Sequence, residues 1–580
     1  MMQTSVLIIG AGATGTGIAR DLALRGVSCL VVEQRDVNAG ASGGNHGLLH
    51  SGARYVLSDP EAAIECRDEG ALLKRLAPHC IDDCGGLFVA VDGDDETFAH
   101  QFPVLCEQNH VPCREIDPAR ARELEPALCE RVFAAFEVDD ASVDPFMLSL
   151  DNLAQALSLG ARVRRNARVL SFERNGACIT RVQLMDETTG QPFSIQTEQV
   201  IIAAGAWSGP LARMAGAEIN VHCSQGTLAI TQDRITRRAI NRLRPPTDAD
   251  ILVPGGTVSI LGTTSVRIDS PDLCRPSVAE VDRMIDDARA MIPVLDSTRY
   301  MRAYAGVRPL VSHGEAGDDR AVSRGFDLID HARFGVDNCL TITGGKLTTY
   351  RLMAERATDL VCRKLNVSAP CLTRTEPLPP SANGRWTRAG ESARAWVDRL
   401  RRNDVILCEC EMVSRDTVTA IVDELGEMRG RSALTAIGLR SRMGKGPCQG
   451  GFCGPRVTSH LYDIGQLDGD QGIHELKRFI QRRWRGKAPV LWGTDLMQAE
   501  LQEALHCGVF ELELAPPGPE PTAQAAHDPA SEDPSLKEDG TQTPPLTGTA
   551  AEHLPDKTGS HGSAGDSIVP GGPLSEEDTP

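Results

Sequence analysis

The first 35 residues alternate short apolar runs with an amphipathic stretch. Residues 6–9 are all apolar, Ile18, Leu22 and Leu24 are apolar positions of the segment that follows, and residues 28–32 are again mostly apolar. Two short apolar runs on either side of an amphipathic helix are typical of parallel strands joined by a crossover helix. The pattern therefore predicts a strand, a helix and a second strand, in that order.

Three glycines, Gly10, Gly12 and Gly15, punctuate the turn between the first strand and the helix. In a dinucleotide-binding turn they allow the tight bend, the approach of a pyrophosphate and close helix–strand packing, and the helix N-terminus offers its N–H groups to the phosphates. Glu33, 18 residues beyond Gly15, ends the second strand and is placed to accept hydrogen bonds from a ribose diol. The motif predicts a Rossmann-type site but does not separate FAD from NAD.

Three later segments favour FAD. Residues 200–208 (VIIAAGAWS) form an apolar strand that ends in a small-residue turn, and residues 340–355 (LTITGGKLTTYRLMAE) contain a strand, a glycine pair and a helix start. A helix N-terminus at that glycine pair would stabilise the negative charge that a flavin acquires on reduction. Residues 40–55 (GASGGNHGLLHSGARY) combine glycines with two histidines, which suits backbone packed on a flat ring system.

Four cysteines near the C-terminal end of the folded region form two tight pairs. Cys408 and Cys410 are followed, after 37 residues, by Cys448 and Cys453. Four thiolates so spaced can hold a metal centre, either an iron–sulfur cluster or zinc. Cys-x-Cys is less typical of zinc, and nearby glycines and basic residues would donate to cluster sulfurs and offset cluster charge. These are Gly444, Gly446, Gly450, Gly451, Gly454, Arg440, Arg442 and Lys445.

Charge and composition exclude some classes of protein. The net charge of −19 argues against binding nucleic acid through broad phosphate contacts. Residues 515–580 hold twelve acidic residues, two lysines, twelve of the 35 prolines and no aromatic residue, which predicts a disordered tail. No segment has the apolar length of a membrane span, and no targeting peptide precedes the first strand. We expect a cytoplasmic protein, or one peripheral on the cytoplasmic face of the inner membrane.

Several motifs resemble one known family. They are GAGATGTGIARDLALRG, GASGGNHGLLHSGARY, GTTSVRID, AYAGVRPL, VSRG and ITGGKLTTYRLMAE, and the resemblance runs from about residue 1 to 510. The chain is similar to the large subunit (the A-subunit) of the anaerobic glycerol-3-phosphate dehydrogenases, within the glycine-oxidase-like (DAO) FAD oxidoreductases. One departure is that the turn at residues 224–227 (SQGT) lacks a histidine that aerobic single-subunit relatives have there.

The resemblance implies an α/β fold with a Rossmann-type FAD-binding domain and an inserted antiparallel-sheet (α+β) substrate domain. Residues 1–375 would form the oxidoreductase domain, with FAD-binding parts at about 1–75, 141–210 and 326–375 and substrate parts at about 76–140 and 211–325. A linker (376–402), a small helical [2Fe–2S] domain like bacterioferritin-associated ferredoxin (403–460), an amphipathic helical segment (461–514) and the tail (515–580) would follow. Strands are expected at 252–253 and 259–262 in a sheet over the flavin.

The resemblance also implies site residues. The FAD-contacting positions would be Gly10, Ala11, Gly12, Ala13, Thr14, Gly15, Glu33, Gln34, Arg35, Ser42, Leu49, Ala204, Gly205, Gly344, Gly345, Lys346, Leu347 and Thr348. Glycerol 3-phosphate would be bound by Arg54, Tyr55, Arg308, Arg324 and Lys346, because arginine meets phosphate oxygens bidentately. Arg308 or Lys346 would orient the C2 oxygen. His50, whose ordinary pKa is near neutrality, is the candidate proton acceptor, unless it only packs on the ring.

Metal ligation and partners complete the expectation. Cys408, Cys410, Cys448 and Cys453 would bind a [2Fe–2S] cluster that passes electrons to a second flavoprotein subunit, a membrane-anchoring iron–sulfur subunit and finally quinone. Two alternatives stay open: an amino-acid or 2-hydroxyacid dehydrogenase with an appended cluster domain, and a non-catalytic electron-relay subunit. Residues 472–487 form an amphipathic helix whose apolar side holds Ile473, Leu476, Phe479, Ile480 and Trp484. This helix either docks a partner or an anionic membrane surface, or packs on the cluster domain.

Overall fold

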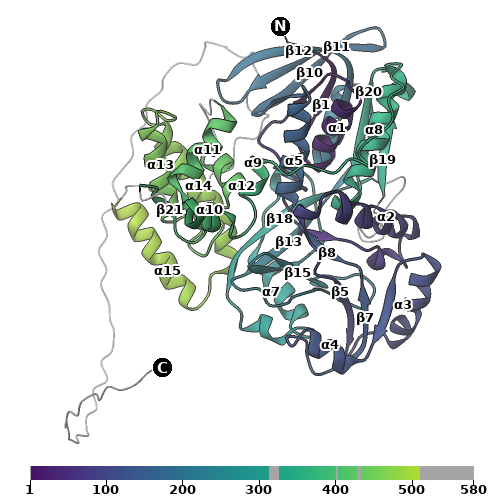
Figure 1. Ribbon diagram of the computed structural model, residues 1–580, viewed down its shortest axis with the longest axis vertical. Coiled ribbons are helices and arrows are strands. Elements are labelled where there is room, and N and C mark those ends of the chain that lie inside the picture. Colours follow the sequence, from purple (N-terminus) through teal and green to yellow (C-terminus); the bar gives the residue numbers. More distant parts are fainter. Residues whose placement is uncertain (1, 312–324, 400–402, 427–432, 510–511, 513–580) are drawn as a thin grey trace, which may run out of the picture. The chain divides into compact units, whose positions relative to one another are not determined.

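The computed structural model describes residues 2–311, 325–399, 403–426, 433–509 and 512. Arg324 and the tail at 515–580 lie outside these residues, so the expectations for them stay predictions. Within the described residues, Figure 1 shows two large sheets, drawn mainly in purple to teal, and a set of green and yellow helices formed by the residues after about 380.

The first sheet has eight strands among the described residues. Its central strands β1 (Met2–Ile9), β2 (Cys29–Val32) and β12 (Gln191–Ile202) are parallel, and β20 (Cys339–Gly344) and β9 (Arg162–Arg164) extend this parallel part. β10 (Ala167–Asn175), β11 (Cys178–Asp186) and β19 (Phe326–Asp330) pair antiparallel. Helix α1 (Ala13–Leu24) packs against α5 (Pro145–Ser158) and α8 (Tyr350–Lys364), and Ile8, Ile18 and Leu22 are fully buried in this core. The predicted strand–helix–strand unit is confirmed.

The second sheet is mainly antiparallel and supplies the other wall of the site. Its strands are β5 (Gly86–Val91), β6 (Cys113–Ile116), β7 (Val132–Val138), β13 (Val221–Thr231), β14 (Ala239–Arg242), β15 (Ile251–Gly255), β16 (Val258–Gly262), β17 (Val266–Ile268) and β18 (Tyr300–Val311). Three helices contact this sheet: α3 (Glu96–Gln108), α4 (Pro118–Leu124) and α7 (Val278–Ala288). The strands expected at 252–253 and 259–262 lie in β15 and β16. β13 pairs with β18 along its length, which sets Ser224 opposite Arg308.

A small three-stranded sheet fixes the chain between the two large ones. β3 (Leu48–Leu49) and β4 (Ile81–Asp82) both pair with β8 (Ala141–Val143). Helix α2 (Pro60–Leu76) follows, capped by the side chain of Asp59, which accepts from the N–H of Ala62. The pairing of β3 with β8 thereby anchors the C-terminal end of the 40–50 loop.

Residues from 382 onward form a helical module around the four cysteines. Its elements are α9 (Ala382–Arg385), α10 (Glu391–Arg399), β21 (Ile406–Cys408), β22 (Val413–Ser414), α11 (Arg415–Leu425), α12 (Ala433–Ser441), α13 (Cys453–Asp463), α14 (Gln471–Lys487) and α15 (Thr494–Glu503). The stretch expected as a linker thus contains two helices, and its Trp386 is buried in the module's core with Phe479. Of the five residues on the predicted apolar face of α14, Leu476, Phe479 and Ile480 are buried, whereas Ile473 and Trp484 are 43% and 47% exposed.

A buried ion pair joins the module to the end of the second strand of the first sheet. Arg440 donates from Nη1 and Nη2 to the two carboxylate oxygens of Asp36, at 2.9 and 3.0 Å, and both side chains are almost fully buried. Burial raises the pKa of Asp36, but Arg440 and Arg165 outweigh it and hold the pKa at about 2. We expected Arg440 to offset charge at the cysteines; its partner is instead Asp36, 404 positions away in sequence.

Replacing Asp36 by asparagine should destabilise the protein by roughly 2–3 kcal/mol at neutral pH, from the depression of its pKa. Because the folded-state pKa lies below the unfolded value of about 3.9, the stabilisation is present above that value and disappears as the pH falls toward about 2. Urea unfolding of wild type and Asp36→Asn should give a constant difference from about pH 8 to 5 and a shrinking one below about pH 4. A difference that instead grows on acidification would contradict this role.

Candidate active site and cysteine centre

One cavity of about 600 Å³ runs between the two large sheets. One part of its lining is formed by Gly10, Gly12 and Thr14, and another part by Arg54 and Arg308. The cavity therefore connects the predicted nucleotide-binding turn to the predicted phosphate-binding arginines.

The glycine turn in the first part of the lining leaves no room for side chains. Gly10 has φ +111°, and a Cβ there would lie 2.5 Å from the carbonyl oxygen of Ala203; a Cβ on Gly12 would lie 2.9 Å from Ser42 Oγ. Ser42 Oγ accepts a hydrogen bond from the N–H of Ala13, 2.9 Å away, in the first turn of α1. This bare backbone beside a helix N-terminus fits the pyrophosphate of a dinucleotide.

Gly15 lies beneath the turn, where a Cβ would stand 1.9 Å from the carbonyl oxygen of Gly10. We expect Gly15→Ala to lower the free energy of unfolding by about 3 kcal/mol or more and to reduce cofactor retention, since backbone must move to admit the methyl group. Urea unfolding and cofactor stoichiometry measure both effects. Gly508→Ala is the matched control, because a Cβ there meets nothing within 4 Å. Equal stability of the two variants would refute the packing role of Gly15.

Glu33 ends β2 at the cavity wall, as the sequence predicts. Its two carboxylate oxygens accept from the N–H groups of Ala11 and Arg35, at 3.0 and 2.9 Å. Burial raises the pKa of Glu33, and these two N–H groups oppose the rise. The carboxylate is thus fixed at the position where a ribose diol would meet it.

Most of the predicted cofactor residues line the cavity. They are Gly10, Gly12, Ala13, Thr14, Glu33, Gln34, Arg35, Ser42, Ala204, Gly205, Gly344, Gly345, Lys346 and Leu347. Ala11, Gly15, Leu49 and Thr348 do not line it, and each has a structural contact instead. Thr348 Oγ1, for example, accepts from the N–H of His50 at 3.1 Å, and Leu49 is buried in a core cluster.

The glycine pair after β20 adopts left-handed backbone, with φ +85° at Gly344 and +71° at Gly345. The sequence predicted a strand, a turn at this pair and a helix start within residues 340–355, and the structure confirms this order. The structure has a short 3₁₀ helix (Leu347–Thr349) first, and α8 starts at Tyr350. The glycine pair, the 3₁₀ turn and the first turn of α8, through Tyr350 and Met353, all line the cavity.

The substrate end gathers three cations held by neighbours. Arg54 Nη2 donates to Asp250 Oδ2 at 2.8 Å, and Arg308 donates to the carbonyl oxygen of Thr264 at 3.1 Å and to Thr263 Oγ1. Lys346 Nζ stands 5.1 Å from the centre of the Tyr55 ring, on which it makes a cation–π contact. Three of the four predicted substrate cations, with Tyr55, thus line the cavity, where Arg54 and Arg308 interact with His46, and Arg54 and Lys346 with His50.

His50 lies among these groups. Its Nε2 is 3.4 Å from Tyr55 Oη, and the two ring centres are 5.1 Å apart. Burial, followed by His46, Arg54 and Lys346, lowers the pKa of His50 well below its usual 6.5. The imidazole is therefore uncharged near neutral pH, and one of its ring nitrogens keeps a lone pair.

Three contributors to this end were not predicted from the sequence. Asp250, fully buried, orients both Arg54 and Arg244, and Thr264 fixes Arg308. Asp250 lies 196 positions from Arg54, so nothing local signals the pair. His46 lines the cavity as well, and its position in the glycine-rich loop was the available signal.

The four cysteine sulfurs lie together. Cys448 interacts with Cys410 and Cys453, and Cys453 with Cys408. All four cysteines are among the described residues, and no three of their sulfurs all lie within 4.8 Å of one another. The sulfurs therefore form an extended set of contacts rather than one compact tetrahedron.

Backbone and basic side chains surround the sulfurs. Contact with Cys453, followed by the N–H groups of Glu411 and Gly444, lowers the pKa of Cys408; Phe452 and Gly450 N–H groups act likewise on Cys448. The expected cations are engaged elsewhere: Arg442 pairs with Glu411 at 2.8 Å, and Lys445 Nζ lies 4.5 Å from the Phe146 ring centre. Arg456, Arg483 and Lys487 instead interact electrostatically with these cysteines.

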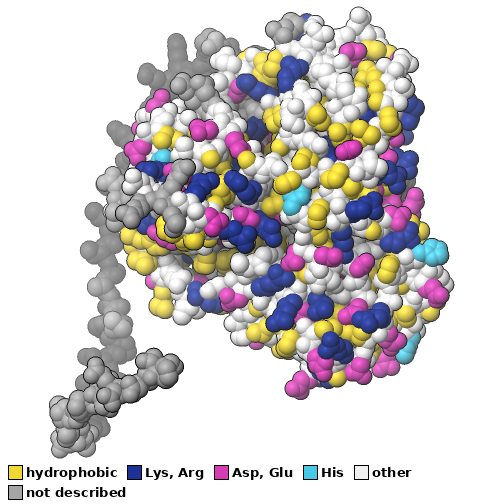
Figure 2. Space-filling model, in the orientation of Figure 1, with side chains coloured by type: hydrophobic (Ala, Val, Ile, Leu, Met, Phe, Trp, Pro, Cys, Tyr) yellow, Lys and Arg dark blue, Asp and Glu magenta, His cyan; other side chains and the backbone are white. Residues whose placement is uncertain are grey.

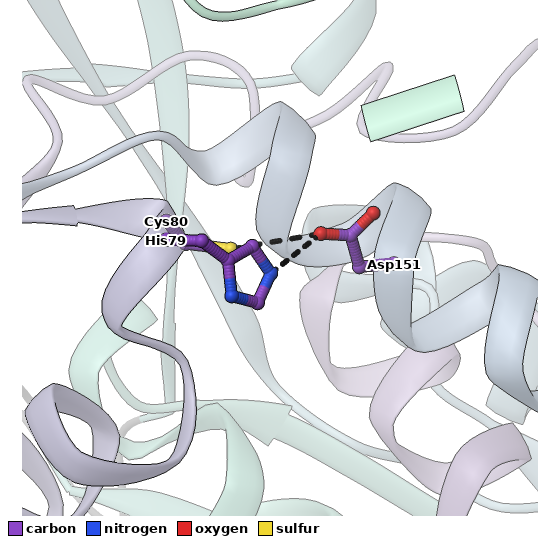
Figure 3. Close-up of side chains that lie close together, drawn as sticks. All are labelled: His79, Cys80 and Asp151. Atoms are coloured by element: carbon purple, nitrogen blue, oxygen red, sulfur yellow. Dashed lines mark hydrogen bonds and ion pairs between the residues drawn. The ribbon is translucent and has the colours of Figure 1, made fainter. Parts of the chain in front are cut away.

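Figure 3 shows the compact trio, formed by His79, Cys80 and Asp151. His79 Nε2 is 2.9 Å from Asp151 Oδ2, while Asp151 Oδ1 accepts from both the N–H, at 3.0 Å, and the hydroxyl of Ser381. Both carboxylate oxygens are thus already engaged, and burial followed by Asp151 raises the pKa of Cys80 well above 9. We interpret the trio as a structural contact in which Asp151 of α5 holds Ser381 by hydrogen bonds.

The comparisons with known proteins agree with this geometry. The family described as FAD dependent oxidoreductase (DAO) matches residues 5–360. The chain belongs to this family of FAD-dependent oxidoreductases, and FAD is the cofactor that the cavity has to fit.

Closer relatives narrow the family. The chain is 40% identical over 532 residues to the A-subunit of the anaerobic glycerol-3-phosphate dehydrogenase of Escherichia coli K12, in a match that covers 88% of this chain and 97% of the relative. The A-subunit of the Haemophilus influenzae enzyme is 39% identical, with 88% and 94% covered, and the A1-subunit of the Haloferax volcanii enzyme is 36% identical, with 88% and 91% covered. The chain therefore also belongs to the family of anaerobic glycerol-3-phosphate dehydrogenase A-subunits.

Solved structures confirm the predicted fold class. The FAD-complexed glycerol-3-phosphate dehydrogenase of Bacillus halodurans is similar with a TM-score of 0.58 and 22% identity, covering 85% of this chain and 96% of that chain. Glycine oxidase of Geobacillus kaustophilus has a TM-score of 0.53 and 20% identity, covering 65% and 99%. These likenesses extend to the fold and no further.

Proposed function

We propose that the protein is the catalytic subunit of an FAD-dependent glycerol-3-phosphate:quinone oxidoreductase, which oxidises sn-glycerol 3-phosphate to dihydroxyacetone phosphate. The observation that carries the proposal is that Arg54, Arg308 and Lys346 line the same cavity as the glycine turn and lie near His46 and His50. The names of the bacterial dehydrogenase relatives support the choice of substrate.

Each residue has a task that its geometry supports. Arg54, oriented by Asp250, and Arg308, oriented by Thr264, would bind the phosphate with directional donors. Lys346 would orient the C2 oxygen, and His50 would accept the hydroxyl proton. Bound FAD would supply the hydride acceptor.

His50→Gln should lower the turnover number roughly 100-fold or more if His50 is the base. The pKa of His50 lies well below 6.5, so the unprotonated imidazole persists as the pH is lowered. The decrease of wild-type kcat/KM on the acidic side should therefore have its midpoint below about pH 6.5. Steady-state rates across the pH range test both points. His100→Gln, on the exposed surface of α3, is the control. An unchanged rate and pH profile in His50→Gln would exclude this role.

The cysteines are proposed to hold a [2Fe–2S] cluster. A tetrahedral zinc site, with zinc–sulfur bonds of about 2.3 Å, would bring all four sulfurs within roughly 4 Å of one another. The extended arrangement and the N–H groups of Gly444 and Gly450 favour ligation of two irons instead. Iron and acid-labile sulfide in a one-to-one ratio would support the cluster, and stoichiometric zinc would refute it.

Partner subunits would carry the electrons onward, through a second flavoprotein and a membrane-anchoring iron–sulfur subunit to quinone. No helix among the described residues is long and apolar enough to span a bilayer. α15 contacts the cysteine loop, since Gln502 Nε2 donates to the Cys448 carbonyl oxygen at 3.1 Å. It exposes Leu496, Met497 and Leu501, and Figure 2 shows hydrophobic side chains on this part of the surface. This face supports contact with a partner near the cluster.

Substrate comparison separates the proposal from its alternatives. With an artificial electron acceptor, glycerol 3-phosphate should give a kcat/KM at least roughly 100-fold above that of amino acids and 2-hydroxyacids, because the cations match a phosphate dianion. A carboxylate substrate that performs better would favour the amino-acid or hydroxyacid dehydrogenase. Complete inactivity with every substrate would favour an electron-relay subunit.

A further inference from the structure

His46 occupies a rigidly held position beside the reacting end of the cavity. Its neighbour Asn45 is held through both its side chain and its backbone. The side-chain amide donates to the carbonyl oxygens of Ala41 and Ser42, and the backbone carbonyl accepts from Tyr304 Oη at 2.7 Å. On the other side, the carbonyl of Gly47 accepts from the N–H of Val143 at 2.7 Å. The backbone of His46 therefore has little freedom.

A backbone hydrogen bond fixes the tautomer of His46. The N–H of Leu48 donates to His46 Nδ1 at 3.1 Å, so Nδ1 carries the lone pair. In a neutral imidazole the single proton then resides on Nε2. Burial, followed by Arg308 and Arg54, lowers the pKa of His46 to about 3, so the ring stays neutral at physiological pH. Nε2 is consequently a hydrogen-bond donor and has no lone pair with which to accept a proton.

The neighbouring His50 complements this donor, because it is the proposed proton acceptor. The rings of His46 and His50 lie edge to face, with centres 5.9 Å apart and planes at 75°. An oxygen atom reached by both rings would meet a fixed donor on one side and a proton acceptor on the other. Residues 224–227, expected as a turn, lie within strand β13 and contain no histidine, and a Cβ on Gly226 would already lie 2.5 Å from Arg308 Nη2.

We propose that His46 is a catalytic hydrogen-bond donor, whose Nε2–H contacts the substrate hydroxyl oxygen that becomes the carbonyl oxygen. This inference rests on the proposed function. As the alcohol is oxidised, the carbon-bound hydrogen leaves with its electron pair to the cofactor, the hydroxyl proton passes to His50, and the C=O bond forms. His46 keeps its own proton throughout and stabilises the negative charge that develops on the oxygen.

The first test compares two ligands that differ at this oxygen. Binding to dithionite-reduced protein, in which no turnover occurs, is measured by calorimetry for glycerol 3-phosphate and for 3-hydroxypropyl phosphate, which lacks the C2 hydroxyl. Wild type should bind glycerol 3-phosphate roughly 5- to 10-fold more tightly, as expected for one hydrogen bond. His46→Phe should lose this preference, while His46→Gln, which keeps an N–H donor, should retain part of it.

The second test is kinetic. Removal of a preorganised donor should slow substrate-driven reduction roughly 100-fold in His46→Phe. His100→Phe, an identical change on the exposed surface, should leave the rate unchanged. Bound-flavin stoichiometry reports whether a variant folds. If His46→Phe does not fold, the rate of reduction is measured in His46→Gln instead.

The outcomes separate this inference from the function beneath it. If glycerol 3-phosphate fails to reduce wild type, the proposed function is wrong. If wild type is reduced but His46→Phe keeps both the wild-type rate and the wild-type preference for the C2 hydroxyl, the donor role of His46 is wrong.

Discussion

Replacing Arg308 by leucine should reduce kcat/KM for glycerol 3-phosphate roughly 100- to 1,000-fold, since it removes a charged donor from a desolvated phosphate site. Arg308 pairs with Ser224 in the register of β13 and β18, and its guanidinium is oriented by the carbonyl oxygen of Thr264. Arg308→Lys should recover only part of the loss, because an ammonium keeps the charge but not the planar fork. Stopped-flow reduction with increasing substrate separates the binding loss from the chemical loss.

The matched control is Arg120→Leu, in which an exposed arginine with one ion-pair partner on the same helix is removed. It should leave kcat/KM within about twofold, as is usual for a surface ion pair. Cofactor content of Arg308→Leu must equal that of wild type for the comparison to hold. If Arg308→Leu then kept wild-type affinity for glycerol 3-phosphate, the arginine would not be a phosphate ligand.

Cys448→Ser should uncouple oxidation of the substrate from electron exit. The substrate cavity is lined by other residues, so flavin reduction by glycerol 3-phosphate should stay within about twofold of wild type. Transfer to a one-electron acceptor that takes electrons through the cluster should fall roughly 100-fold or more, because serine is a poor iron ligand in place of a thiolate. Electron paramagnetic resonance of the reduced protein reports the cluster directly.

Cys178→Ser provides the control, since Cys178 is an exposed cysteine on β11 of the first sheet. This variant should keep wild-type iron, sulfide and electron transfer. Retention of a full cluster signal in Cys448→Ser would show that Cys448 is not a ligand.

The sequence predicts those parts of the protein that depend on interactions between residues close together in the chain. The turn at Gly10, Gly12 and Gly15 is predictable because backbone crowding by Ala203 and Gly10 itself allows no side chain there. Glu33 is predictable because it ends a strand at a fixed spacing from the turn. Resemblance to a family added Arg54, Arg308 and Lys346, which in the structure line the same cavity as that turn.

The parts that were not predicted depend on contacts between distant segments. Asp250 aims Arg54 across 196 positions, and Arg440 reaches Asp36 across 404, so neither pairing leaves a trace in spacing or periodicity. The same holds for Trp386, which lies in a stretch with the composition of a polar linker but is buried among the helices of the cysteine module.

The central claim is that this chain itself oxidises glycerol 3-phosphate with a bound flavin. The most direct measurement is the absorption spectrum of the purified protein during anaerobic titration with glycerol 3-phosphate. The account predicts a yellow protein whose flavin band bleaches as substrate is added, with dihydroxyacetone phosphate formed in equal amount. A protein that stays colourless after reconstitution with FAD, or a flavin band that glycerol 3-phosphate leaves unchanged, would contradict it.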